Sequence, residues 1–191
     1  LSPSSAPVAT NTLHTPDWAK NAVIYEVNIR QFSKEGTFNA FTKELPRIHE
    51  LGVDILWLMP IYPLATTNRK CHDNVTSECF GSHYAAIDFE AVNPRYGTMD
   101  DFNRLVSEAH RLNMKVILDF VPNHTGWDAK WMKEHPDWYE KGPDGKITDP
   151  INSDGTKWGW TDVAQLDFDN PQLREAWMRA HEFWLKNTAI D

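Results

Sequence analysis

The chain has 191 residues, of which 41% are hydrophobic and 12% aromatic, so it is long and apolar enough to bury the core of a globular domain. Its formal net charge of −8 argues against nucleic acid or an anionic membrane surface as a partner. No run approaches the roughly 20 apolar residues of a membrane span, and no basic and then apolar signal peptide opens the chain.

The first half of the chain alternates strand and helix signals. Residues 1–16 are rich in Ser, Pro, Thr and Ala and are predicted to form a flexible leader or linker. Residues 22–27 form the first expected strand, and Thr37 then caps an amphipathic helix that Pro46 should interrupt or kink. Residues 53–58 are the second expected strand, which completes a strand, helix and strand unit.

The connection over residues 61–96 is long, and loops of this length commonly bind a ligand. Cys71 and Cys79, the only cysteines, can close a small loop as a disulfide. A zinc site would need more ligands than these two residues and His72 provide. The cysteine pair and the glycosylation sequon Asn74-Val75-Thr76 favour an extracytoplasmic location, either secreted, periplasmic or attached to the surface.

A second strand, helix and strand unit follows this connection. Thr98 begins a capping box at the start of an amphipathic helix, and residues 115–121 form an apolar third strand. Asp119 is expected on this strand, while Asn123 and His124 come just past its carboxyl end, where parallel-sheet enzymes bind ligands. The repeated order predicts a parallel sheet with right-handed crossovers and helices on its outer side.

Beyond His124 the chain is unusually rich in tryptophan and does not enter a helix directly. Trp131 and Trp138 are interpreted as the small core of this excursion. For Trp127, Trp158 and Trp160, core packing and a sugar-stacking role both remain open. Asn170 then caps a third amphipathic helix, and residues 188–191 look like the beginning of a fourth strand.

Two segments of the chain resemble the α-amylase family of glycoside hydrolases. Asp119-Phe-Val-Pro-Asn-His124 matches the family signature D-x-V-x-N-H, and Gly81 to Thr98 is similar to the segment that leads into the second barrel helix. The resemblance implies an α/β fold, the (β/α)8 TIM barrel, present here as its first three to four β/α units. It implies barrel units one to three over residues 17–121, a domain B-like excursion over 122–168, and the third barrel helix with the start of strand four over 169–191.

The resemblance also implies roles for individual residues. Tyr84 holds the place of the tyrosine that stacks on the sugar ring beside the cut bond, and Asp88 holds the place of a nearby acid that contacts substrate. His124 is expected to contact the sugar, and Asp119 to support the active-site network. Asn123 is expected near the substrate and as a ligand of a structural calcium ion.

The chain departs from the family pattern at two positions. Gly81 stands where many members carry an aspartate, which removes one expected hydroxyl contact. Gln165 stands where several calcium-dependent relatives carry an aspartate, which would weaken a site for a hard cation. Calcium at Asn123 therefore stays open, and no other cofactor is expected.

The resemblance implies that the complete protein hydrolyses α-glucosidic bonds in starch-like α-glucans or malto-oligosaccharides by a retaining mechanism. The nucleophile and the general acid are expected after Asp191, in the remainder of the barrel, so no residue of this chain is assigned to them and the chain alone is expected to be inactive. The alternatives are a non-catalytic relative used for binding or assembly and an unrelated barrel enzyme.

Overall fold

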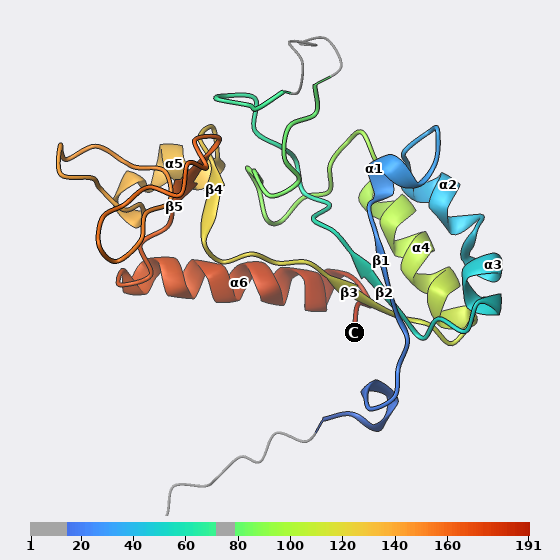
Figure 1. The fold of residues 1–191 in the computed structure, drawn as a ribbon. Helices are drawn as coiled ribbons and strands as arrows, with labels where there is room; N and C mark the ends of the chain where they lie inside the picture. The colour runs from blue at the N-terminus through green and yellow to red at the C-terminus, as the bar shows by residue number, and fades with distance from the viewer. Residues whose placement is uncertain (1–14, 72–78) are drawn as a thin grey trace, which may run out of the picture.

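The computed structural model describes residues 15–71 and 79–191, and Figure 1 shows their arrangement. The greater part of the expected leader and the sequon Asn74-Val75-Thr76 lie outside the described residues. Within the part of the chain that is described, no helix is long and apolar enough to cross a membrane.

A three-stranded parallel sheet forms the centre of the molecule. Its strands are β1 (Ile24–Val27), β2 (Ile55–Leu58) and β3 (Lys115–Leu118), in the spatial order β1-β2-β3. The register places Val27 beside Leu58 and Leu58 beside Leu118, so all three strands end at one edge. The predicted parallel sheet is confirmed, although each strand is shorter than expected. In particular β3 ends at Leu118, which leaves Asp119 just beyond the strand rather than on it.

The expected helices are present, and Pro46 interrupts the first of them as predicted. The helix bounds are α1 (Ile29–Phe32), α2 (Phe38–Thr42), α3 (Leu45–Glu50), α4 (Met99–Arg111), α5 (Lys130–Glu134) and α6 (Pro171–Asn187), with 3-10 turns at η1 (Asp17–Ala19) and η3 (Pro136–Trp138). The helix expected after Thr37 is divided into α2 and α3, because Pro46 lacks the N–H that a continuous helix would use. Helix α1 was not predicted; the Asn28 side chain caps it by accepting the Gln31 N–H.

The two longer helices begin where their caps predict. Thr98 accepts the backbone N–H of Asp101, and Asp101 in turn accepts the N–H of Thr98, which completes the expected capping box of α4. Asn170 accepts two backbone N–H groups at the start of α6, and Pro171 occupies the first turn. After α6 the chain returns to the sheet, where Asp191 N donates to Val116 O over 2.9 Å.

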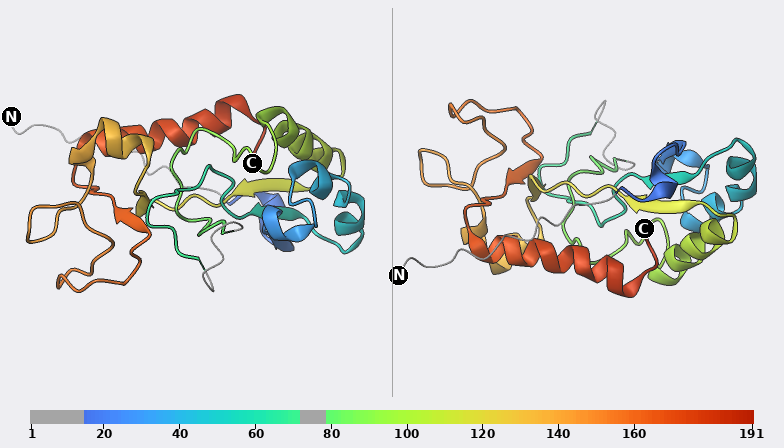
Figure 2. Two further views of the ribbon diagram at one scale, coloured as in Figure 1. Left: turned by 90° about the horizontal axis from the view of Figure 1, so that it is seen from above. Right: turned by 90° about the horizontal axis from the view of Figure 1, so that it is seen from below.

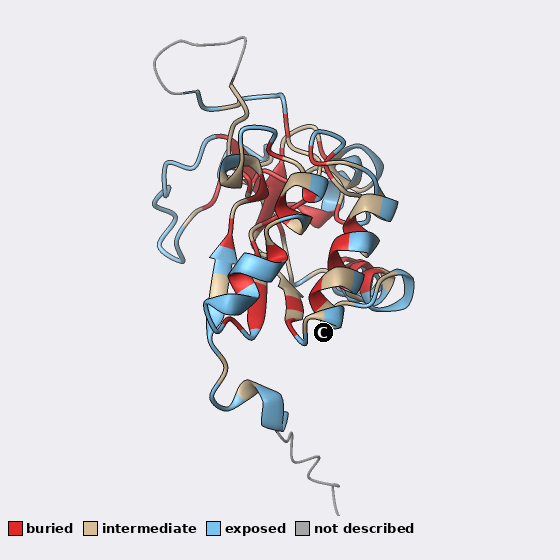
Figure 3. Cartoon of the chain, turned by 90° about the vertical axis from the view of Figure 1, so that its right-hand side faces the viewer, coloured by how far each residue is buried: buried red, intermediate tan, exposed pale blue. Residues whose placement is uncertain are grey.

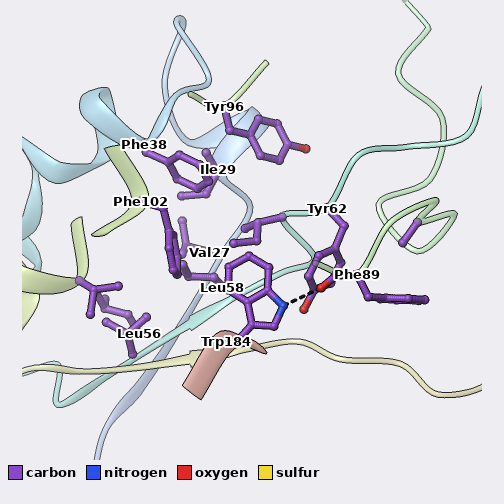
Figure 4. Packing of buried hydrophobic residues seen from close by; sticks show 14 of the residues in the cluster. Val27, Ile29, Phe38, Leu56, Leu58, Tyr62, Phe89, Tyr96, Phe102 and Trp184 are labelled. Carbon is purple, nitrogen blue, oxygen red and sulfur yellow. Dashed lines mark hydrogen bonds between the residues drawn. The ribbon is translucent and has the colours of Figure 1, made fainter. Parts of the chain in front are cut away.

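The core is aromatic and lies between the sheet and its helices. Trp184 of α6 is almost fully buried beside Tyr62 and Phe102, and its Nε1 donates to the carbonyl of Phe89 over 2.6 Å (Figure 4). In the central sheet β2 is the most buried strand, and Figure 3 also shows buried residues on one side of the helices. Because α6 brings Trp184 against the loop after β2, it fixes that loop relative to β3.

The excursion after β3 contains a small sheet that the sequence did not predict. Strand β4 (His124–Gly126) pairs antiparallel with β5 (Val163–Gln165), and His124 lies opposite Gln165. Trp138 is buried as expected, and Trp131 is partly buried against it with the ring centroids 5.6 Å apart. Figure 2 shows this part of the chain at one end of α6, with α1 to α4 at the other.

Candidate active site

Tyr84 and Asp119 meet beyond the carboxyl ends of the strands. The ladder between β2 and β3 continues for one bond, because Asp119 N donates to Leu58 O over 2.9 Å. The loop after β2 carries Tyr84 to the same place, where its hydroxyl donates to Asp119 Oδ2 over 2.9 Å. Tyr62 donates its hydroxyl to the backbone carbonyl of Asp119 over 3.2 Å. Both the backbone and the carboxylate of Asp119 are therefore held in place.

The environment of Tyr84 and Asp119 keeps the Tyr84 hydroxyl protonated, so that it remains a hydrogen-bond donor. Burial raises the pKa of the Asp119 carboxyl, while hydrogen bonds from Tyr84 and Trp57 act in the opposite direction. Burial, followed by the hydrogen bond and charge of Asp119, raises the pKa of Tyr84 to about 12. The Tyr84 hydroxyl thus stays protonated at neutral pH and orients its ring through Asp119.

His124 approaches the same region from the excursion after β3. As the first residue of β4 it lies inside the small sheet, and only 4% of it is exposed. Asn123 Nδ2 lies 3.0 Å from His124 Nδ1, and burial lowers the pKa of His124 against an opposing effect of Asp162. The ring is therefore neutral at pH 7, and a neutral imidazole can exchange hydrogen bonds with a ligand hydroxyl.

A pocket of about 540 Å3 brings Tyr84 and His124 together. This volume lies in the ordinary range for small-molecule sites. Its lining comes from the loop after β2 and from the excursion after β3: Lys70, Ser82, Tyr84, Val121, His124, Trp160, Asp162 and Val163. Lys70 joins the loop after β2 to the excursion after β3, since its Nζ lies 3.4 Å from Asp162 Oδ1 and 2.7 Å from the carbonyl of Gly159.

The sequence did not indicate five of the lining residues: Lys70, Ser82, Val121, Asp162 and Val163. Ser82 lies two residues before Tyr84, and Asp162 follows the Trp158 to Trp160 pair, so closeness to those motifs was the available signal. The contact between Lys70 and Asp162 joins residues 92 positions apart and has no local signature in the sequence.

Two expected site residues do not line this pocket. Asp88 Oδ1 accepts the backbone N–H of Glu90 over 2.9 Å, which makes its carboxylate part of a turn. Asn123 directs its amide to His124 and so lies behind the histidine. The geometry gives Asp88 no contact with the pocket, and it makes Asn123 a residue that positions His124.

The residues around Asn123 do not form a set of calcium ligands. Gln165 Oε1 already accepts the Ile151 N–H over 2.7 Å, and Asp149 Oδ1 pairs with Lys157 Nζ at 2.6 Å, whereas the buried Asp149 Oδ2 has no hydrogen-bond partner among the described residues. Calcium takes six to eight oxygen ligands, commonly including several carboxylates. Within residues 15–71 and 79–191 there is no group of three or more His, Cys, Asp or Glu side chains that could hold a metal ion. The donors described around Asn123 are too few for the calcium ion that the resemblance implies, and we assign none of them to a metal.

Cys71 and Cys79 form a disulfide beside the pocket-lining Lys70. Arg69 extends this support by donating to the carbonyls of Ala65 and Cys79 over 2.6–2.8 Å. The segment that carries Lys70 is thereby bonded to residues on both sides of it in the sequence, Ala65 and Cys79. The cysteines serve as a covalent bridge rather than as metal ligands.

Comparison with known proteins identifies the family. The family model described as alpha amylase, catalytic domain, matches residues 17–191. The chain belongs to the alpha-amylase family. The chain is 30% identical over 197 residues to Alpha-amylase 3 of Dictyoglomus thermophilum, covering 88% of this chain and 35% of that protein. It is 39% identical over 128 residues to trehalose-6-phosphate hydrolase of Bacillus subtilis, covering 64% and 20%.

Solved structures of family members agree with the fold. An alpha-amylase from Lactobacillus plantarum superposes with a TM-score of 0.77 at 39% identity, over 88% of this chain and 37% of that one. A maltogenic alpha-amylase from Thermotoga neapolitana gives a TM-score of 0.78 at 31% identity, over 91% and 38%. The chain therefore spans about a third of the length of these alpha-amylase relatives, and its α/β architecture corresponds to part of their barrel.

Proposed function

We propose that the complete protein carrying this chain is a glycoside hydrolase that cleaves α-glucosidic bonds in starch-like α-glucans and malto-oligosaccharides with retention of configuration. The observation that carries the proposal is the convergence of Tyr84 and His124 in one pocket, with Tyr84 bonded to Asp119. Membership of the alpha-amylase family supports the reaction class, since relatives carry names such as alpha-amylase and oligo-1,6-glucosidase.

Each of these residues has a distinct part in the proposed site. The Tyr84 ring offers an aromatic face on which the C–H face of a pyranose packs. His124 is neutral and exchanges hydrogen bonds with a sugar hydroxyl, while Asn123 fixes the orientation of its ring. Asp119 is a positioning residue that acts through Tyr84. The excursion over residues 122–168 forms a separate domain-like unit that supplies the second wall of the pocket.

We assign the nucleophile and general acid to the remainder of the barrel. A retaining glycosidase needs two carboxyl groups about 5 to 5.5 Å apart on either side of the scissile bond. Of the acids discussed here, Asp119 accepts a bond from Tyr84 and Asp162 pairs with Lys70, so neither is presented freely to a sugar. Calcium at Asn123 is not part of the proposal.

The test uses the complete protein on maltotetraose, starch and pullulan, with product anomers followed by NMR. Retaining hydrolysis releases the α-anomer first. Release of the β-anomer would contradict the mechanism, and products longer than the substrate would indicate transfer, a reaction for which the family has named members. Binding without any turnover would instead support a non-catalytic binding or assembly protein.

We also propose that the protein acts in an oxidising, extracytoplasmic compartment. The support is the Cys71–Cys79 disulfide, because such bonds persist mainly outside the reducing cytosol. Mass spectrometry of protein from its native source, alkylated without reduction, tests this. An unmodified bridge is expected, whereas two alkylated thiols would contradict the assignment.

A further inference from the structure

Two tryptophans in the excursion expose large apolar surface beside the pocket. Trp158 is 43% exposed and Trp160 is 45% exposed. Single exposed apolar residues are ordinary, but these two are in contact, with ring centroids 4.7 Å apart and planes at 86°. In this arrangement the edge of one ring packs on the face of the other, so the two side chains form one continuous aromatic surface.

This surface continues from the proposed sugar site. Trp160 lines the pocket, and its ring centroid lies 5.7 Å from that of His124 at an interplanar angle of 81°. Trp158 contacts Trp160 but does not line the pocket. A ligand that leaves the pocket past His124 therefore meets Trp160 first and Trp158 next.

Hydrogen bonds hold the segment that carries both tryptophans. Trp158 Nε1 donates to Asn152 Oδ1 over 2.6 Å, and its backbone N–H donates to Pro150 O over 2.9 Å. Between the two tryptophans in the sequence, the carbonyl of Gly159 accepts Lys70 Nζ over 2.7 Å. Since these bonds anchor Trp158 and the adjoining Gly159, the aromatic surface is formed before a ligand arrives, which lowers the entropic cost of binding.

The polar groups around this surface suit a neutral ligand with hydroxyl groups. Lys70 and Asp162 have opposite charges and lie within 3.4 Å of each other at the pocket wall. The charges compensate locally, yet both groups keep hydrogen-bonding capacity that a hydroxyl can use. Aromatic faces flanked by such groups match a pyranose, which has apolar C–H faces and a polar rim.

We propose that Trp158 and Trp160 form a second sugar-binding platform, which holds a glucosyl unit next to the one in the pocket and so selects longer α-glucan chains. This inference rests on the proposed function, because it takes the Tyr84 and His124 pocket as the place of the first sugar. Trp160 contacts both units, and Trp158 contacts only the added one. Lys70 positions the platform through Gly159.

The test measures equilibrium binding to the complete protein by calorimetry, with thio-linked maltotetraose and glucose as probes. Sulfur in place of the glycosidic oxygen prevents cleavage, so binding is measured separately from catalysis. Trp158→Ala is expected to weaken the tetrasaccharide about three- to tenfold, as the loss of one aromatic contact implies, and to leave glucose binding unchanged, because a single unit fills only the pocket. Trp160→Ala is expected to weaken both probes, the longer one more.

Trp18→Ala is the matched control, since Trp18 is 42% exposed and packs near Lys115 at the amino ends of the strands. It should bind both probes as the wild type does. Unchanged tetrasaccharide binding in Trp158→Ala, an equal loss for both probes, or a wild type that binds the two probes equally would overturn the platform. Turnover of ordinary maltotetraose by the wild type is assayed separately, so a failure of the proposed function is distinguishable from a failure of the platform.

Discussion

Replacement of Tyr84 by phenylalanine removes one hydroxyl and keeps the ring. The lost bond is the 2.9 Å contact to Asp119 Oδ2. Hydrogen bonds to charged groups contribute about 1.5–3 kcal/mol, and because Tyr84 is only half-buried we expect the lower value, about 1.5 kcal/mol, or roughly tenfold in an equilibrium. The pKa of Asp119 should rise further, because the Tyr84 hydroxyl lowers it.

A double-mutant cycle isolates this bond. Free energies of unfolding in urea are measured for the wild type, Tyr84→Phe, Asp119→Ala and the double variant of the complete protein, and we expect a coupling energy of about 1.5 kcal/mol. Tyr62→Phe is the matched control, because its hydroxyl contacts the backbone carbonyl of Asp119, which Asp119→Ala retains. A Tyr84 coupling no larger than that of Tyr62 would refute the reasoning. The kcat/KM of Tyr84→Phe for maltotetraose should fall about tenfold, in line with the same bond energy.

Three further predictions concern pH, metal and catalysis. His83 is buried and its pKa is lowered to about 4 by burial and by Arg30, so its contribution to stability is complete above pH 6.5 and is lost as the pH falls towards 4. This lowering of the His83 pKa corresponds to about 3 kcal/mol in the free energy of unfolding. His83→Gln should therefore lack this part of the loss of stability in acid. An identical pH dependence of stability in the wild type and His83→Gln would contradict the prediction. Excess EDTA should change the thermal midpoint of the complete protein and of its Asn123→Ala variant by the same amount, because Asn123 directs its amide to His124; a fall with EDTA that recovers with calcium only while Asn123 is present would argue for a calcium site there. The 191-residue chain alone should show no turnover of starch or pullulan beside the complete protein, and turnover that disappears in Asp119→Asn would place catalysis in this chain.

The parts of the fold with local causes were predictable from the sequence. Thr98 and Asn170 mark the starts of α4 and α6 because a cap is a contact within three residues. Pro46 divides its helix for an equally local reason. The parallel order of the strands followed from the alternation of strands and helices, which leaves few other topologies.

The parts of the site that depend on distant contacts were not predictable in the same way. Strand β4 contains only three residues and exists because β5 pairs with it from about forty residues away. Lys70, in the loop after β2, bonds to Gly159 and Asp162 in the excursion after β3. No local sequence pattern encodes how these two segments lie relative to each other. Asp88 matched a motif position, yet it does not line the pocket, and its carboxylate accepts the Glu90 N–H in a turn. Sequence motifs located Tyr84 and His124, and the tertiary structure determined what surrounds them.

The most direct test of the proposed sugar site is a crystal structure of the complete protein with a bound malto-oligosaccharide. We predict a glucosyl ring packed on the face of Tyr84, with one of its hydroxyls within hydrogen-bonding distance of the His124 ring. The next unit of the chain should lie over Trp160. A sugar bound elsewhere on the protein, with the Tyr84 and His124 pocket empty at a saturating concentration, would contradict the account.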